Sequence, residues 1–200
     1  MADEPKLVRK RPTKDEVLAS AFYYAVKAHE YQVRKGTGLP YIEHPVRVAA
    51  LLMEMRASSD MVAAGFLHDV VEDTDRTAEE LARMFGPAVA KLVTAVSENK
   101  GDTWDSRKQK TLRALRTADY TVVRLVLADK LDNIRSIADD FGRNGENVWL
   151  RFSRPFEKQR WYYKGLARVL KLRTKHHREY RWTEEFCALV KTVFKQGPAS

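Results

Sequence analysis

A run of apolar residues that contains a dense acidic cluster constrains this chain more than any other feature. The run reads MVAAGFLHDVVED over residues 61–73 and predicts a buried helix. Because Glu72 follows His68 by four residues and Asp73 follows Asp69 by four, each pair should share a helix face. Ionised carboxylates in apolar surroundings are costly unless they are paired or bound to a cation. A divalent cation is the simplest partner for this cluster.

Two further residues of similar chemistry lie outside this run. His44 lies in YIEHPVRVA at the entrance of an apolar helix, and Asp129 interrupts VVRLVLADKLDNI. Taken alone, His44 could be only a helix-entry residue. Asp129 alone could be a buried ion-pair partner of Arg124 or Lys130. Together with the His68-Asp69 pair, however, they offer two nitrogens and two oxygens, a donor set that suits manganese, iron or zinc and leaves positions for water.

The remaining sequence predicts helices almost throughout, and we expect an all-α bundle of about eight to nine helices. Residues 122–127 are also compatible with a strand, but the apolar pattern continues to Ile137 at helical spacing. Capping boxes, prolines and serine caps mark the helix starts. The predicted helices run from Thr13 to about Val33, Pro45 to about Met55, Met61 to Asp73 with Ser58 and Ser59 as possible caps, Thr77 to Gly86, Pro87 onward, Asp105 to Leu115, Asp119 to about Asp139, Arg154 to Leu172 and Trp182 to Phe194, with a loop over residues 144–151.

Composition excludes several classes of protein. No apolar run approaches the roughly 18 residues that a membrane span needs, and the polar segment Met1–Arg11 does not have the pattern of a signal peptide. Cys187 is the only cysteine, which excludes an internal disulfide and a cysteine metal cluster. We therefore expect a cytoplasmic protein.

The net charge of +9 is concentrated near the C-terminus, especially from Lys164 to Arg181. Such a charge suits a nucleotide phosphate, a nucleic acid or a membrane surface. It could equally belong to a solvated helix face.

The order of His44, the His68-Asp69 pair and Asp129 resembles the HD superfamily of metal-dependent phosphohydrolases. The stretches GTGLPYIEHPVRVAALL, AAGFLHDVVEDTDRTAEELARMFGPAVAKLVTAVSE and VRLVLADKLDNIRSI are similar to the hydrolase domain of RelA/SpoT enzymes. The resemblance is strongest to stand-alone small alarmone hydrolases such as the metazoan SpoT homologue. It covers about Lys14 to Ile137 and includes a complete HDxxED string, which marks hydrolase-competent members of the family.

This resemblance implies a single HD-type domain at residues 13–195, between flexible segments at 1–12 and 196–200. The match fades after about Asp140. In the unmatched part we expect aromatic residues near 161–162 to pack mainly in the core. The sequence leaves no room for a synthetase domain, so the resemblance implies a hydrolase only.

The resemblance also implies roles for individual residues. The residues that match metal ligands are His44, His68, Asp69 and Asp129. The metal in this family is usually Mn²⁺, although another divalent transition metal is possible. The residues that match the acidic pair beside the attacking water are Glu72 and Asp73. The residues expected to contact the nucleotide are Arg34, Lys35, Lys130, Asn133 and Ser136, of which the cations suit a polyanionic substrate.

We therefore expect manganese-dependent hydrolysis of the 3′-diphosphate of a purine alarmone, (p)ppGpp or (p)ppApp. The products would be pyrophosphate and GDP or GTP, or the adenosine equivalents. The first alternative is another HD phosphohydrolase, such as an NADPH 2′-phosphatase or a nucleotidase. The second is a non-enzymatic binder of nucleotides or nucleic acid, against which the intact HDxxED string argues. We expect a small nucleotide as partner, no membrane and no nucleic acid, and the oligomeric state stays open.

Overall fold

The fold is all-α, as the sequence predicts. A computed structural model describes residues 13–35 and 37–195. Within these residues there is no strand, and the only extended pairing is an antiparallel bridge between Val33 and Pro40. None of the described helices is long and apolar enough to cross a membrane. The segments 1–12 and 196–200, predicted to be flexible, lie outside the described residues.

Nine of the described α-helices have eight residues or more, which confirms the expected bundle, and α4 adds a single turn. The elements are α1 (Lys14–Ala28), α2 (Glu43–Glu54), α3 (Ser59–Leu67), α4 (Val70–Asp73), α5 (Ala78–Phe85), α6 (Pro87–Val96), α7 (Trp104–Leu115), α8 (Tyr120–Asn144), the 3₁₀ helix η1 (Gly145–Arg151), α9 (Phe156–Thr174) and α10 (Tyr180–Val193).

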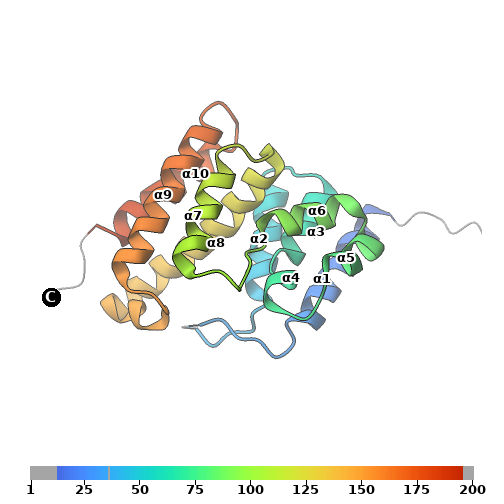
Figure 1. Cartoon of the computed structure of the whole chain (residues 1–200), viewed down its shortest axis with the longest axis horizontal. Helices are drawn as coiled ribbons and strands as arrows, with labels where there is room; N and C mark the ends of the chain where they lie inside the picture. The colour runs from blue at the N-terminus through green and yellow to red at the C-terminus, as the bar shows by residue number, and fades with distance from the viewer. Residues whose placement is uncertain (1–12, 36, 196–200) are drawn as a thin grey trace, which may run out of the picture.

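Helix α8 lies at the centre of the bundle. It packs against α2, α3 and α6 on one side and against α9, α10 and η1 on the other (Figure 1). Every residue of helix α3 from Met61 to Leu67 is buried, as the apolar sequence predicts. Polar groups carried into this region by α2, α3 and α8 therefore meet in surroundings from which water is largely excluded.

Local signals explain where several helices begin and end. The capping boxes at Thr13 and Thr77 are both formed, and each threonine accepts a hydrogen bond from the backbone N–H three residues later. Gly86 has φ +90°, which a side chain would oppose, and it ends α5 just before Pro87 opens α6. The segment that contains residues 122–127 is helical rather than a strand.

The predicted end of the first helix is wrong. Helix α1 ends at Ala28, five residues before the predicted boundary at Val33. The chain then turns, with the Gln32 N–H donating to the His29 carbonyl, and Val33 pairs with Pro40. Tertiary pairing thus overrides the helical pattern. Two smaller differences are that α2 begins two residues before Pro45, and that most of the predicted loop at 144–151 is a 3₁₀ helix.

The expected single helix over MVAAGFLHDVVED is also wrong, because it is divided at His68 and Asp69. In a continuous α-helix the Gly65 carbonyl would accept the Asp69 N–H. Instead the His68 Nδ1–H donates to this carbonyl at 2.9 Å. Helix α3 therefore ends at Leu67 and α4 starts at Val70. Asp69 and Asp73 nevertheless stay one helical turn apart, as expected, because the Asp73 N–H donates to the Asp69 carbonyl at 2.8 Å.

Gly65 brings α3 close to α2, and its replacement tests this packing. An added Cβ would lie 2.7 Å from Leu52 Cδ1 and 3.2 Å from Ala49 Cα. We expect Gly65→Ala to lower the free energy of unfolding by about 1–3 kcal/mol in urea denaturation. Gly142→Ala in α8, where an added Cβ meets nothing within 4 Å, is the control and should stabilise by up to about 1 kcal/mol. Equal stabilities of the two variants would contradict this packing.

Candidate metal and nucleotide site

Four side chains predicted as metal ligands converge at the centre of the bundle. His44 comes from the start of α2, His68 and Asp69 from the turn between α3 and α4, and Asp129 from α8. The atoms offered by His44, His68 and Asp129 all lie within 4.8 Å of one another. Asp69 Oδ2 lies 3.6 Å from His44 Nε2 and 3.1 Å from His68 Nε2. The structure therefore brings the four side chains together.

The two histidines are held with the same ring nitrogen directed inward. His44 Nδ1 lies 2.6 Å from Asp132 Oδ2, and His68 Nδ1 lies 2.9 Å from the Gly65 carbonyl. Since both partners are acceptors, each Nδ1 carries hydrogen and each Nε2 offers a lone pair. The two Nε2 atoms lie only 3.2 Å apart. Facing lone pairs at this distance need a proton or a cation between them.

The electrostatics of the cluster also favour positive charge. Burial lowers the pKa of His68, but the carboxylates of Asp69 and Asp129 outweigh this and raise it to about 9. The carboxylates that would hold a proton on the imidazole would equally attract a divalent cation to its lone pair. The donor set of two imidazoles and two carboxylates thus fits a divalent metal ion.

Hydrogen bonds orient the two carboxylates. The Tyr41 hydroxyl donates to Asp69, while burial and the nearby carboxylates raise the pKa of Tyr41 and keep its proton in place. Asn133 Nδ2 donates to Asp129 Oδ1 at 2.6 Å, and Lys130 Nζ lies 2.7 Å from Asp129 Oδ2. The ion-pair interpretation of Asp129 is therefore correct for Lys130, but the same carboxylate also faces the two histidines.

The predicted acidic pair is split between two environments. Glu72 accepts a hydrogen bond from the Glu98 N–H at 2.9 Å, and its burial raises its pKa above the usual range. Lys100 Nζ lies 2.8 Å from Asp73 Oδ1, and Tyr41 donates to Asp73 Oδ2 at 3.4 Å. The guanidinium of Arg107 lies farther from Glu72, at 3.8 Å from its Oε1. With this weaker ion pair and its place in the same cavity as the candidate ligands, Glu72 is favoured over Asp73 as a proton acceptor.

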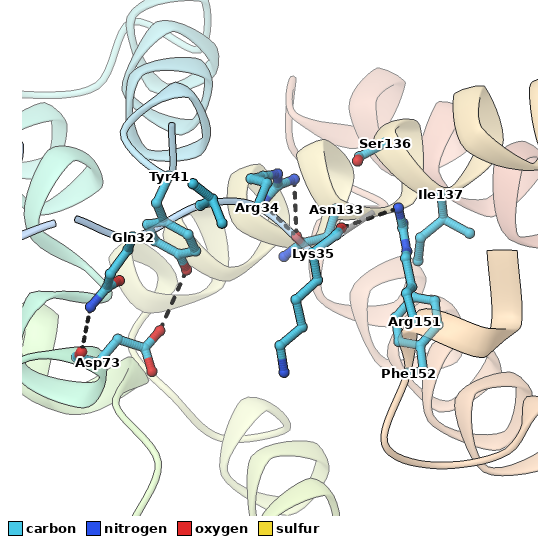
Figure 2. Close-up of a pocket in the computed structure, with 11 residues that line it drawn as sticks. Gln32, Arg34, Lys35, Tyr41, Asp73, Asn133, Ser136, Ile137, Arg151 and Phe152 are labelled. Carbon is cyan, nitrogen blue, oxygen red and sulfur yellow. Dashed lines mark hydrogen bonds between the residues drawn. The ribbon is translucent and has the colours of Figure 1, made fainter. Parts of the chain in front are cut away.

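Two cavities meet at the cluster. The larger, of about 810 Å³, is lined by the four candidate ligands and Glu72, and it extends between α6, α7 and α8. The smaller, of about 520 Å³, is lined by Asp73 and by residues of the loop after α1, of α8 and of η1 (Figure 2). Tyr41 and Asn133 line both cavities and so mark the boundary between them.

The predicted nucleotide-contacting residues are divided between these cavities. Arg34, Lys35 and Ser136 line the smaller cavity, while Lys130 lines the larger one. Arg34 has a second role, because its guanidinium lies 3.1 Å from Asp132 Oδ2. It also lies 3.5 Å from Asn133 Oδ1 (Figure 2). It therefore also supports the carboxylate that orients His44.

Sequence reasoning missed several residues of the site. Asp132 is buried and bonds His44, Arg34 and Arg47, and the hydrogen bonds from His44 and Arg47 hold its pKa below the usual value despite burial. Its position three residues after Asp129, on the same helix face, could have indicated it. Nothing in the sequence pattern indicates the remaining residues, whose roles depend on tertiary contacts. These are Tyr41, Glu98, Arg151 and Phe152.

The aromatic residues expected in the core behave differently from each other. Tyr162 is buried and lines the larger cavity, whereas Trp161 is 42% exposed. The expectation is thus confirmed for Tyr162 and wrong for Trp161. Successive residues of an α-helix are about 100° apart around its axis, so Trp161 can lie at the solvent edge of α9 while Tyr162 and Tyr163 face the bundle.

Comparison with known proteins places this arrangement in a family. A curated relative from Aquifex aeolicus, named guanosine-3′,5′-bis(diphosphate) 3′-pyrophosphohydrolase, is 38% identical over 138 residues, which are 68% of this chain. The matched region is 20% of that relative, so the chain spans only about one fifth of its length.

Two solved structures have a similar fold. The structure of lmo0812 from Listeria monocytogenes is 35% identical, with a TM-score of 0.70 over 76% of this chain and 99% of that one. The structure of a metazoan SpoT orthologue, described as hydrolysing ppGpp, shares the fold at 24% identity, with a TM-score of 0.72 over 94% of this chain and 97% of that one. A family model described as HD domain matches residues 21–154. The chain therefore belongs to the HD-domain family and is similar to the RelA/SpoT type of hydrolase within it.

Proposed function

We propose that this protein hydrolyses the 3′-diphosphate of a purine alarmone, (p)ppGpp or (p)ppApp, with Mn²⁺ as its metal. The observation that carries the proposal is the pair of inward-facing Nε2 atoms of His44 and His68 beside two carboxylates, with Glu72 in the same cavity. The activity for which the Aquifex relative is named needs such a site. The single cysteine and the nucleotide substrate suit a cytoplasmic setting.

The two cavities suit the two parts of such a substrate. The 3′-diphosphate would lie at the ligand cluster, where Lys130 is close to Asp129. The nucleoside and its 5′-phosphates would extend past Asn133 into the smaller cavity. There the exposed Lys35 supplies positive charge, and Phe152 offers an aromatic ring for a purine. Arg151 lines the same cavity but already pairs with Asp140 at 2.6 Å and lies over the Phe152 ring.

The residues present fit a metal at His44, His68, Asp69 and Asp129. When bound there, a divalent cation supplies Lewis acidity, which lowers the pKa of a neighbouring water and polarises a phosphoryl oxygen. Glu72 takes the proton from the attacking water, which its raised pKa favours. Asp73, already engaged by Lys100 and Tyr41, holds the neighbouring structure in place.

The reaction balances as a hydrolysis. The water oxygen forms a bond to the phosphorus attached to the 3′-oxygen, and the bond between that phosphorus and the 3′-oxygen breaks. Pyrophosphate leaves with the water oxygen, and the 3′-oxygen keeps the nucleoside and takes up a proton. The products are pyrophosphate and the nucleoside 5′-diphosphate or 5′-triphosphate.

The direct test is product analysis by ion-exchange chromatography. The protein would be incubated with ppGpp, ppApp and NADPH, each with and without Mn²⁺. We expect Mn²⁺-dependent pyrophosphate release from an alarmone, and the faster substrate identifies the preferred base. Free phosphate from NADPH alone would instead assign an NADPH 2′-phosphatase and overturn the proposal.

Replacement of Glu72 by glutamine tests the assignment of the base. We expect Glu72→Gln to bind Mn²⁺ nearly as the wild type does while kcat falls about 10²- to 10⁴-fold, because the amide cannot accept the proton. Glu79→Gln, at an exposed position in α5, is the matched control and should leave kcat unchanged. A normal kcat for Glu72→Gln would remove Glu72 from the mechanism.

Lys35 tests the nucleotide cavity more cleanly than Arg34, because Arg34 also supports Asp132. Lys35 is exposed and lines the smaller cavity. We expect Lys35→Ala to raise KM for the alarmone about three- to tenfold, with kcat and Mn²⁺ affinity little changed. Lys191→Ala, at an exposed position in α10, serves as the control. If KM were the same in both variants, the nucleoside would not lie in this cavity.

A further inference from the structure

Tyr41 occupies a position between a candidate metal ligand and the acidic pair. Its hydroxyl lies 2.5 Å from Asp69 Oδ2 and 3.4 Å from Asp73 Oδ2. Figure 2 shows the ring at the edge of the smaller cavity with its hydroxyl directed to Asp73. The same residue lines the larger cavity, so the hydroxyl lies where the two cavities join.

The turn after α1 fixes this tyrosine in place. The imidazole of His29 packs against the Tyr41 ring, with ring centroids 4.8 Å apart, and His29 is buried. His29 Nδ1 lies 2.9 Å from Gln32 Oε1, and Gln32 Nε2 donates to the Asp73 carbonyl at 2.8 Å. The Tyr41 N–H in turn donates to the Gln32 carbonyl at 2.9 Å. His29, Gln32 and Tyr41 thus form one support that reaches the C-terminal end of α4.

We propose that Tyr41 is a positioning residue that fixes the Asp69 carboxylate for metal binding and holds Asp73 near it. Asp69 Oδ2 is the oxygen that faces both His44 Nε2 and His68 Nε2. The phenolic O–H occupies one lone pair of this oxygen and leaves another directed at the histidines. A hydrogen bond to a ligating carboxylate in this way tunes both its orientation and its affinity for a metal.

The hydroxyl also counters a repulsion within the turn. Asp69 and Asp73 are one helical turn apart, and the Asp73 N–H donates to the Asp69 carbonyl at 2.8 Å. Two carboxylates at this spacing repel each other. The Tyr41 hydroxyl lies between Oδ2 of Asp69 and Oδ2 of Asp73 and offsets this repulsion. The turn therefore keeps the same conformation in the metal-free protein.

The proposal rests on the metal site within the proposed function, but not on the identity of the substrate. Tyr41→Phe removes only the hydroxyl and keeps the ring against His29. We expect Mn²⁺, titrated calorimetrically into metal-free protein, to bind about 10- to 100-fold more weakly than to the wild type. Alarmone kcat at saturating Mn²⁺ should also fall, because Asp73 loses its donor, while KM should change little.

Tyr31→Phe is the matched control, since Tyr31 is 93% exposed and lies in the same turn. It should bind Mn²⁺ and turn over substrate as the wild type does. If Tyr41→Phe also binds Mn²⁺ with wild-type affinity, the tyrosine is only a packing residue and the proposal is overturned. If the wild type hydrolyses no alarmone but Tyr41→Phe still weakens Mn²⁺ binding, the proposal stands and the substrate assignment fails.

A second variant covers the case in which Tyr41→Phe does not fold, as judged by circular dichroism. Gln32→Leu removes the amide that holds the Asp73 carbonyl and leaves the tyrosine ring in place. We expect Gln32→Leu to lower kcat with a smaller effect on Mn²⁺ affinity, because it removes the hydrogen bond to the Asp73 carbonyl and leaves the Tyr41–Asp69 hydrogen bond in place. Unchanged kcat and unchanged Mn²⁺ affinity for this variant would overturn the proposed support.

Discussion

The close approach of two imidazole nitrogens inside this bundle determines how the neighbouring polar groups of the site must be arranged. His44 Nε2 and His68 Nε2 lie 3.2 Å apart with lone pairs directed inward, because Asp132 and the Gly65 carbonyl bind the opposite ring nitrogens. The bond to Gly65 lies where the apolar segment divides into α3 and α4. It selects the tautomer of His68 and directs its free nitrogen at the carboxylates.

Helix α8 connects the candidate metal ligands to the smaller cavity. Three polar side chains project from this helix within little more than one turn: Asp129, Asp132 and Asn133. Asp132 bonds His44 and Arg34, and Asn133 donates to Asp129. Arg34, in the loop after α1, and His44, at the start of α2, both bind Oδ2 of Asp132, so the two segments share one carboxylate.

Much of the fold and the centre of the site could be predicted from the sequence, since they depend on local signals. Capping boxes and helical periodicity fixed most helices, and carboxylates in apolar runs identified Asp69 and Asp129. The prediction failed where a tertiary contact decides the outcome. The end of α1 depends on pairing between Val33 and Pro40, and the role of Tyr41 depends on Asp69, 28 residues away. Such contacts leave no periodic signal in the sequence.

We propose that the facing histidines and their carboxylates form a divalent-metal site. Anomalous diffraction at the manganese edge, from crystals soaked in MnCl₂, tests this site. We predict one strong peak between His44 Nε2 and His68 Nε2, adjacent to Asp69 and Asp129, and its loss in Asp129→Ala. A wild-type crystal with no peak there, or with a peak that persists in Asp129→Ala, would contradict the account.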